Sequence, residues 1–93
     1  MDSEDPALRT ASTALWLATM SLMTAFMSTS APSDRYMLAR RIASNFAMLC
    51  EQGSFTTPSR TSFAKLAARW QDKADQLAPS LVREAYFERE SAL

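Results

Sequence analysis

No charged side chain occurs between Arg9 and Asp34, so residues 10–33 of this 93-residue chain form one uncharged stretch. A segment of roughly 20 mostly apolar residues is long enough to cross a lipid bilayer. The same pattern is typical of a helix that other parts of the protein cover. The environment of this stretch therefore decides what kind of protein the chain can form.

The composition of the stretch favours cover by protein. Seven of the residues from Thr10 to Ser28 are Ser or Thr, and only three are Leu. Hydroxyl groups lose hydrogen bonds to water when they enter lipid, so a row of them favours a wet side. The row consists of Thr10, Thr13, Ser21, Thr24 and Ser28, interrupted by Leu17. Small residues at four-residue spacing (Ala14 and Ala18, Ser21 and Ala25) keep a membrane helix pair as an alternative.

Glycine usage points to helices throughout the chain. Gly53 is the single glycine, whereas tight hairpins and phosphate-binding loops use several. Prolines and capping residues divide the chain into predicted helices at residues 6–28, 34–51, 58–78 and 81–91. We predict one all-α domain, residues 1–93, folded as an up-down-up three-helix bundle with a short fourth C-terminal helix.

Each predicted helix boundary depends on a residue that favours a helix end. Asp5, Ser33 or Asp34, and Thr57 are the predicted N-caps, Gly53 the residue that closes the second helix, and Pro79 the stop of the third. Phe55 lies in the loop after Gly53, and we expect its ring to close the end of the bundle. Cys50 is expected to be an inert, buried thiol.

Apolar residues recur at helical spacing in all three long helices. The second helix carries Leu38, Ile42, Phe46 and Leu49, flanked by Ala39, Ala43 and Cys50, and the third carries Phe63, Leu66, Ala67, Trp70, Ala74 and Leu77. The first helix carries two stripes: Leu8, Ala11, Leu15, Ala18, Leu22 and Phe26, and beside them Trp16, Met20, Met23 and Met27. One stripe is enough for one neighbouring helix, so the second is either a further core contact or a surface for a partner.

The methionines suggest more apolar surface than one small bundle can cover. Methionine is flexible and polarizable and is frequent at surfaces that accept partners. We therefore predict a homodimer or another protein partner, with an interface formed by Trp16, Met20, Met23, Met27, Met37 and Met48.

Basic residues form a second candidate surface. Residues 34–73 carry seven basic and three acidic side chains, although the whole chain has ten of each. A possible anion-binding set consists of Arg41, Lys65, Arg69 and Lys73. We favour the simpler interpretation of a solvated face balanced by Asp72, Asp75 or the glutamates of the last helix, so nucleic acid is the less favoured partner.

The composition argues against an enzyme. The chain has no histidine, the commonest general base and metal ligand, and its single cysteine has no histidine to activate it. We expect no catalytic residues, no cofactor and no metal. The acidic leader of Asp2, Glu4 and Asp5 is unlike a signal peptide, which favours the cytoplasm.

These observations predict a small non-enzymatic interaction or regulatory module that acts through an apolar helix face, as a homodimer. Two alternatives stay open: a nucleic-acid-associated protein that uses the basic row, and a membrane-tethered protein anchored by the first helix.

Overall fold

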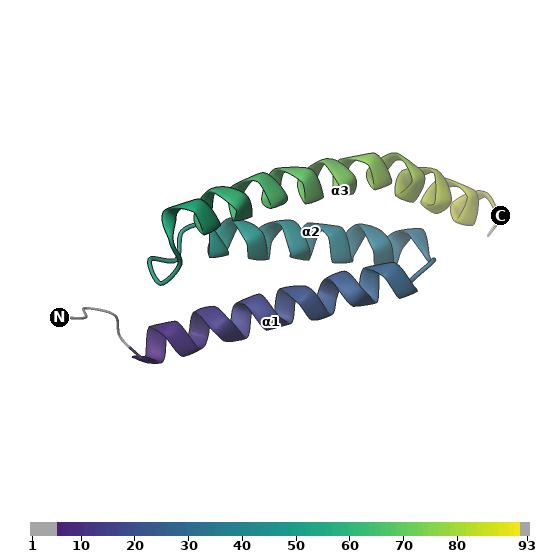
Figure 1. Cartoon of the computed structure of the whole chain (residues 1–93). Coiled ribbons are helices and arrows are strands. Elements are labelled where there is room, and N and C mark those ends of the chain that lie inside the picture. The colour runs from purple at the N-terminus through teal and green to yellow at the C-terminus, as the bar shows by residue number, and fades with distance from the viewer. Residues whose placement is uncertain (1–5, 92–93) are drawn as a thin grey trace.

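The computed structural model describes residues 6–91, with backbone alone for residues 79–91, and within this range it contains three helices and no strand. α1 (Pro6–Ser28), α2 (Pro32–Leu49) and α3 (Thr57–Ser91) alternate in direction, as Figure 1 shows. The predicted all-helical, three-helix arrangement is confirmed. Asp5, the predicted cap of the first helix, lies outside the described residues.

α2 is the central helix of the bundle. It packs closely against both α1 and α3 (Figure 1). The backbones of α1 and α3 lie farther apart and are not in close contact with each other. Aromatic rings bridge the wider gap between the two outer helices. Trp16 lies 5.3 Å from Phe63 and Phe26 lies 5.0 Å from Trp70, measured between ring centroids.

The core follows the predicted stripes of α2 and α3. The side chains of Ile42, Phe46 and Leu49 are fully buried, and the small Ala39 and Ala43 are also buried. α3 contributes the buried Phe63 and Ala74, with Leu66, Ala67, Trp70 and Leu77 packed around them. The stripes predicted for the second and third helices are therefore confirmed.

The line of α1 that faces the core coincides with neither of its predicted stripes, although Phe26 belongs to the first of them. Its buried residues are Ser12, Thr19 and Phe26, which recur at intervals of seven. Leu15 and Leu22 from one stripe and Trp16 and Met23 from the other flank this line. Because the other helices cover α1 from one side only, α1 buries the line of residues that lies between its two predicted stripes. The residues on the outer edges of both stripes are therefore exposed.

The two buried hydroxyl groups of α1 both have hydrogen-bond partners. Thr19 Oγ1 donates to the carbonyl of Leu15 at 2.7 Å. Ser12 Oγ donates to Gln52 Oε1 and accepts from Ser54 Oγ, both at 2.8 Å. The two bonds of Ser12 join the N-terminal half of α1 to the loop between α2 and α3.

The short turn between α1 and α2 is held by one arginine. Arg35 Nη1 donates to the carbonyls of Thr29 at 2.9 Å and Phe26 at 3.3 Å, and its guanidinium lies 4.0 Å from the centroid of the Phe26 ring. These carbonyls belong to the end of α1, where backbone acceptors lack partners within the helix. Arg35 therefore fixes the C-terminus of α1 to the start of α2.

Three predicted helix boundaries were wrong in detail. α2 begins at Pro32, two residues before residue 34, because proline at the first position has a φ suited to a helix. Its N-cap Ala31 makes no side-chain capping bond, because a methyl group has no acceptor. α3 is capped by Thr56, whose Oγ1 accepts from the Ser59 N–H at 3.3 Å. α2 ends at Leu49, and no described glycine has a positive φ, so Gly53 does not close the helix in the predicted way.

The predicted stop at Pro79 and the separate fourth helix also differ from the structure. Residues 81–91 are helical, but they continue α3, which runs from Thr57 to Ser91. An interior proline removes one backbone hydrogen bond and destabilises its helix by about 3 kcal/mol. The residues after Pro79 include Leu, Arg, Glu and Ala, which are good helix formers and favour continuation of α3. α3 curves along its length in Figure 1.

Phe55 behaves as predicted. Its ring is partly buried and lies 5.0 Å from the ring of Phe63 in an edge-to-face arrangement. The loop between α2 and α3 thus folds back and closes that end of the core.

Candidate protein interface

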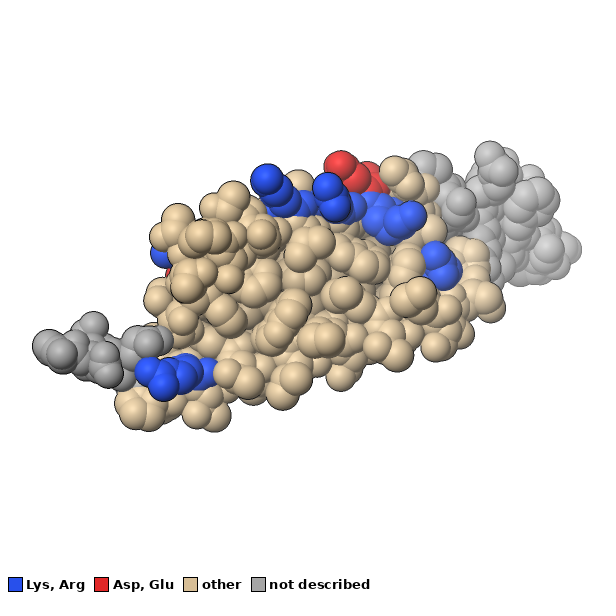
Figure 2. Space-filling model, in the orientation of Figure 1, with Lys and Arg blue, Asp and Glu red and all other residues tan. Residues whose placement is uncertain are grey.

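The side of α1 that points away from α2 has no charged residue beyond Arg9. We call this surface the outer face of α1; it consists of Thr10, Thr13, Ala14, Leu17, Ser21, Thr24, Ala25 and Ser28, all exposed. On the face drawn in Figure 2, Lys and Arg side chains gather along the α3 side, and a further basic group lies at the N-terminal end of α1, while the rest of the surface over α1 and α2 is mostly uncharged. A helix face in water normally carries charges, so an uncharged face of this length is unusual.

Three of the five hydroxyl groups on the outer face are bonded to their own helix. Thr10 Oγ1 donates to the carbonyl of Pro6 at 2.9 Å, Thr24 Oγ1 to that of Met20 at 3.1 Å, and Ser28 Oγ to that of Thr24 at 3.2 Å. Since these three donors are already satisfied, their surroundings can lose water at low cost. The hydroxyl row lies exposed, as the sequence predicted, and three of its five members have hydrogen-bond partners within the helix.

By length and composition α1 could cross a membrane. Its predicted cover by protein is present on one side only, where Ser12, Thr19 and Phe26 are buried. The structure therefore leaves one long side of an apolar helix open.

Of the predicted interface residues, only some are exposed. Trp16 and Met23 pack against the core, whereas Met20 and Met27 on α1 are 46% and 84% exposed. Met37 and Met48, which are also exposed, belong to α2. Met37 lines a shallow hollow of about 310 Å³ together with Arg40, Arg41 and Ser44, so its surroundings are basic. The uncharged part of the candidate interface is therefore on α1.

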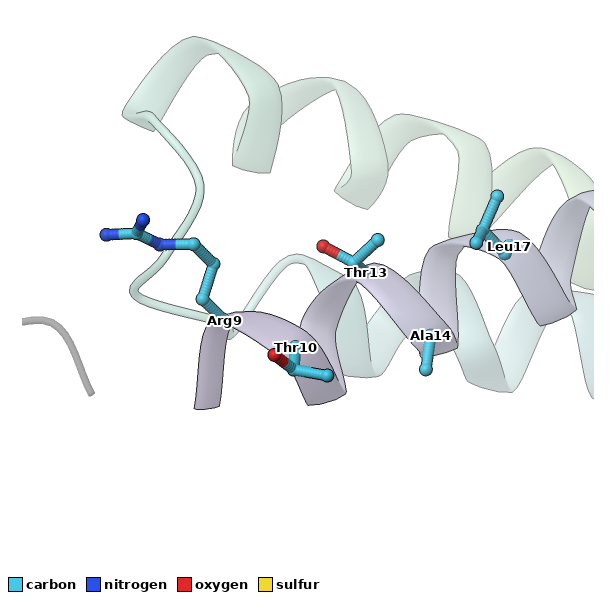
Figure 3. Close-up of a pocket in the computed structure, with 5 residues that line it drawn as sticks. All are labelled: Arg9, Thr10, Thr13, Ala14 and Leu17. Atoms are coloured by element: carbon cyan, nitrogen blue, oxygen red, sulfur yellow. The ribbon is translucent and has the colours of Figure 1, made fainter. Parts of the chain in front are cut away.

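The outer face contains a shallow hollow of about 340 Å³, lined by Arg9, Thr10, Thr13, Ala14 and Leu17 (Figure 3). Thr13 and Leu17 form one edge, Thr10 and Ala14 form the other, and Arg9 extends from the N-terminal end. Thr10, Thr13, Ala14 and Leu17 have the spacing i, i+3, i+4 and i+7. Four residues at this spacing form the hole that receives a side chain from a partner helix in knobs-into-holes packing.

Sequence reasoning missed this hollow because it treated Leu17 as an interruption of a wet row. Leu17 is 58% exposed and is the one large apolar residue among those of the outer face. A leucine surrounded by small residues, with no charge nearby along the helix, was the available signal.

The basic set is exposed and spread over two helices. Arg41 belongs to α2, and Lys65, Arg69 and Lys73 belong to α3. The three α3 residues form no ion pair within the described part of the chain, and Asp75 instead accepts a hydrogen bond from Gln71 Nε2 at 3.0 Å. Exposed basic residues at helical spacing are ordinary for a solvated helix.

Cys50 is half-buried, and its Sγ donates to the carbonyl of Ala47 at 3.1 Å. Arg60 Nε donates to the carbonyl of Cys50 at 2.8 Å and so ties the start of α3 to the end of α2. Among the side chains that the structure describes, no group of three or more Asp, Glu, His or Cys residues could hold a metal ion.

No protein-family model, curated protein or solved structure matches this chain. Any function must therefore be argued from the surfaces described above.

Proposed function

We propose that this protein is a non-enzymatic helical interaction module that forms a homodimer through the outer face of α1. The supporting observation is that the face is exposed yet carries no charge. Isolated apolar residues are common on protein surfaces. A helix side whose one charged residue is Arg9, at its N-terminal end, is better suited to a covered environment than the sides of the other helices, which carry Lys, Arg and Asp.

The energetics favour burial of this face against protein. Burying a leucine side chain fully contributes about 1.5–3 kcal/mol, and Leu17 is 58% exposed in the monomer. The hydroxyls of Thr10, Thr24 and Ser28 keep their bonds to the helix when water leaves. Met20 and Met27 at the edge of the face add flexible apolar contacts. Trp16 and Met23, which belonged to the predicted interface, contribute to the core of the monomer instead.

The mass in solution tests this proposal. Light scattering without detergent, between about 1 and 100 µM protein, is expected to give twice the monomer mass of 10.3 kDa. Leu17→Lys places an ammonium group in the interface and is expected to give monomer, because burying an unpaired charge is strongly unfavourable. Ala68→Lys, at an exposed position of α3, is the matched control and should leave the dimer intact. A wild-type mass of 10.3 kDa at the highest concentration would refute the proposal.

Membrane attachment is a second candidate, favoured by the length and composition of α1. Flotation with phosphatidylcholine vesicles separates the two functions. The homodimer proposal predicts that the protein stays in the soluble fraction, whereas co-flotation with the vesicles would favour a membrane-tethered protein.

A further inference from the structure

We infer that two copies pair through α1 in antiparallel orientation, with Leu17 of each copy seated in the hollow formed by Thr10, Thr13, Ala14 and Leu17 of the other. This inference rests on the proposed homodimer and specifies its geometry. The occupant of the hollow is a second copy of this chain.

A two-fold dimer needs a surface that is complementary to itself, because the same patch serves on both copies. The outer face of α1 has both parts of such a contact within one turn of helix. Leu17 is the projection, being 58% exposed, and the hollow of about 340 Å³ beside it is the recess. When each Leu17 enters the other copy's hollow, the two-fold axis passes near residues 15 and 16.

The residues around this contact allow the two helices to approach closely. Apart from Leu17, the outer face consists of Ala, Ser and Thr. The hydroxyl of Thr10, at the rim of the hollow, is already bonded to the carbonyl of Pro6. The Thr10 donor therefore stays paired when an aliphatic side chain fills the hollow.

The charge distribution selects the antiparallel orientation. Arg9 also lines the hollow, and α1 has no basic residue in its last turn. In a parallel pair the two Arg9 residues would lie at the same level and the two helix dipoles would repel each other. In the antiparallel pair the Arg9 backbones are about 19 Å apart along the axis at 1.5 Å per residue, more than two Debye lengths at physiological salt. Each Arg9 then points toward the C-terminal half of the other α1.

Disulfide trapping tests this geometry. All variants are made in a Cys50→Ser background. The antiparallel pair places residue 10 of one copy opposite residues 20–21 of the other. An equimolar mixture of the Thr10→Cys and Ser21→Cys variants is therefore expected to form the mixed cross-link at least fivefold more than either variant forms a cross-link with itself. Ala68→Cys, on the exposed side of α3, serves as the control and should not cross-link.

The outcomes separate this inference from the proposed function. Self-cross-linking of Thr10→Cys and of Ser21→Cys, without the mixed product, would indicate a parallel pair and overturn the inference while the homodimer stands. A dimeric mass of the reduced variants without any cross-link would place the interface elsewhere and also overturn it. A monomeric mass of the wild-type protein would remove the homodimer itself. Co-flotation of the wild-type protein with phosphatidylcholine vesicles would make lipid the occupant of the face and would equally overturn the inference.

Discussion

α1 and α2 lie side by side, and the less polar of the two is the more exposed. α1 has one charged residue, Arg9, yet only three of its 23 residues are buried, and two of those are Ser12 and Thr19. α2 carries Asp34 and three arginines, yet five of its 18 residues are buried, all of them apolar. Position in the bundle, and not apolar content, decides how much of each helix is covered.

The difference teaches where the stability of this fold resides. α2 contacts both of its neighbours, so its apolar residues form the centre of the core. α1 contributes a line of half-buried residues on one side and leaves the other side open. We therefore expect that substitutions in α2 affect folding most, and that substitutions on the outer face of α1 affect association more than folding.

The largest effect is expected for Phe46→Ala. Phe46 is fully buried and its ring lies about 6 Å from those of Trp16 (6.1 Å) and Phe63 (6.0 Å). Its removal should lower the free energy of unfolding by about 3–5 kcal/mol, measured by urea denaturation at one fixed protein concentration. Leu22→Ala, at a half-buried position of α1, should cost only about 1–2 kcal/mol. Equal losses for the two variants would contradict the central role of α2.

A smaller loss is expected at the turn that joins the two helices. Arg35→Ala removes two bonds to the end of α1 and the contact with the Phe26 ring, and should cost about 1–2 kcal/mol. Amide hydrogen exchange should accelerate in the last turn of α1 more than in α2. The control is Arg40→Ala, because Arg40 is exposed and lies 5.7 Å from the Tyr36 ring, and its loss should cost about 0.5 kcal/mol or less.

The two buried hydroxyls of α1 provide a matched comparison. Ser12→Ala deprives Gln52 and Ser54 of a partner and should destabilise the fold by about 1 kcal/mol. Thr19→Val removes a hydroxyl bonded to its own helix and keeps the shape of the side chain, so unfolding should change by less than about 0.5 kcal/mol. Thermal unfolding followed by circular dichroism measures both. A greater loss for Thr19→Val would show that its hydroxyl has a role beyond its own helix.

The smallest effect is expected at Gly53, and it is stabilising. Gly53 has no positive φ, and a Cβ added there would meet nothing within 4 Å. Gly53→Ala should raise the free energy of unfolding by about 0.4–1 kcal/mol, because it restricts the unfolded chain. A loss of stability in the same urea titration would indicate that the glycine is required in this loop.

Periodicity was sufficient to predict the helices that have a single apolar stripe. The stripes containing Ile42 and Phe46 in α2 and Phe63 and Trp70 in α3 pack against the core, and Phe55 closes its end. In α1 the sequence offered two stripes of similar strength, and the choice between them depends on where the other helices lie. That information is tertiary, and for this reason Ser12 and Thr19 were not predicted to be buried in line with Phe26.

Local end signals were less reliable for a similar reason. Pro79 was expected to stop a helix, but α3 continues through it.

The candidate interface was predicted only in part: Met20 and Met27 are exposed on α1, but the hollow beside Leu17 was not predicted. Rotamers that bond Thr or Ser to the preceding turn cannot be deduced from residue types alone, so the bonds of Thr10, Thr24 and Ser28 to their own helix became visible only in three dimensions.

The central position of α2 has a consequence for synthesis of the chain. During translation α1 emerges from the ribosome before α2, and the helix that will cover its inner side is complete only when Leu49 has been added, about 20 residues later. At 5–20 residues per second this interval lasts roughly 1–4 s. For that time the nascent chain leaves exposed the side of α1, including Phe26, that is buried in the folded protein.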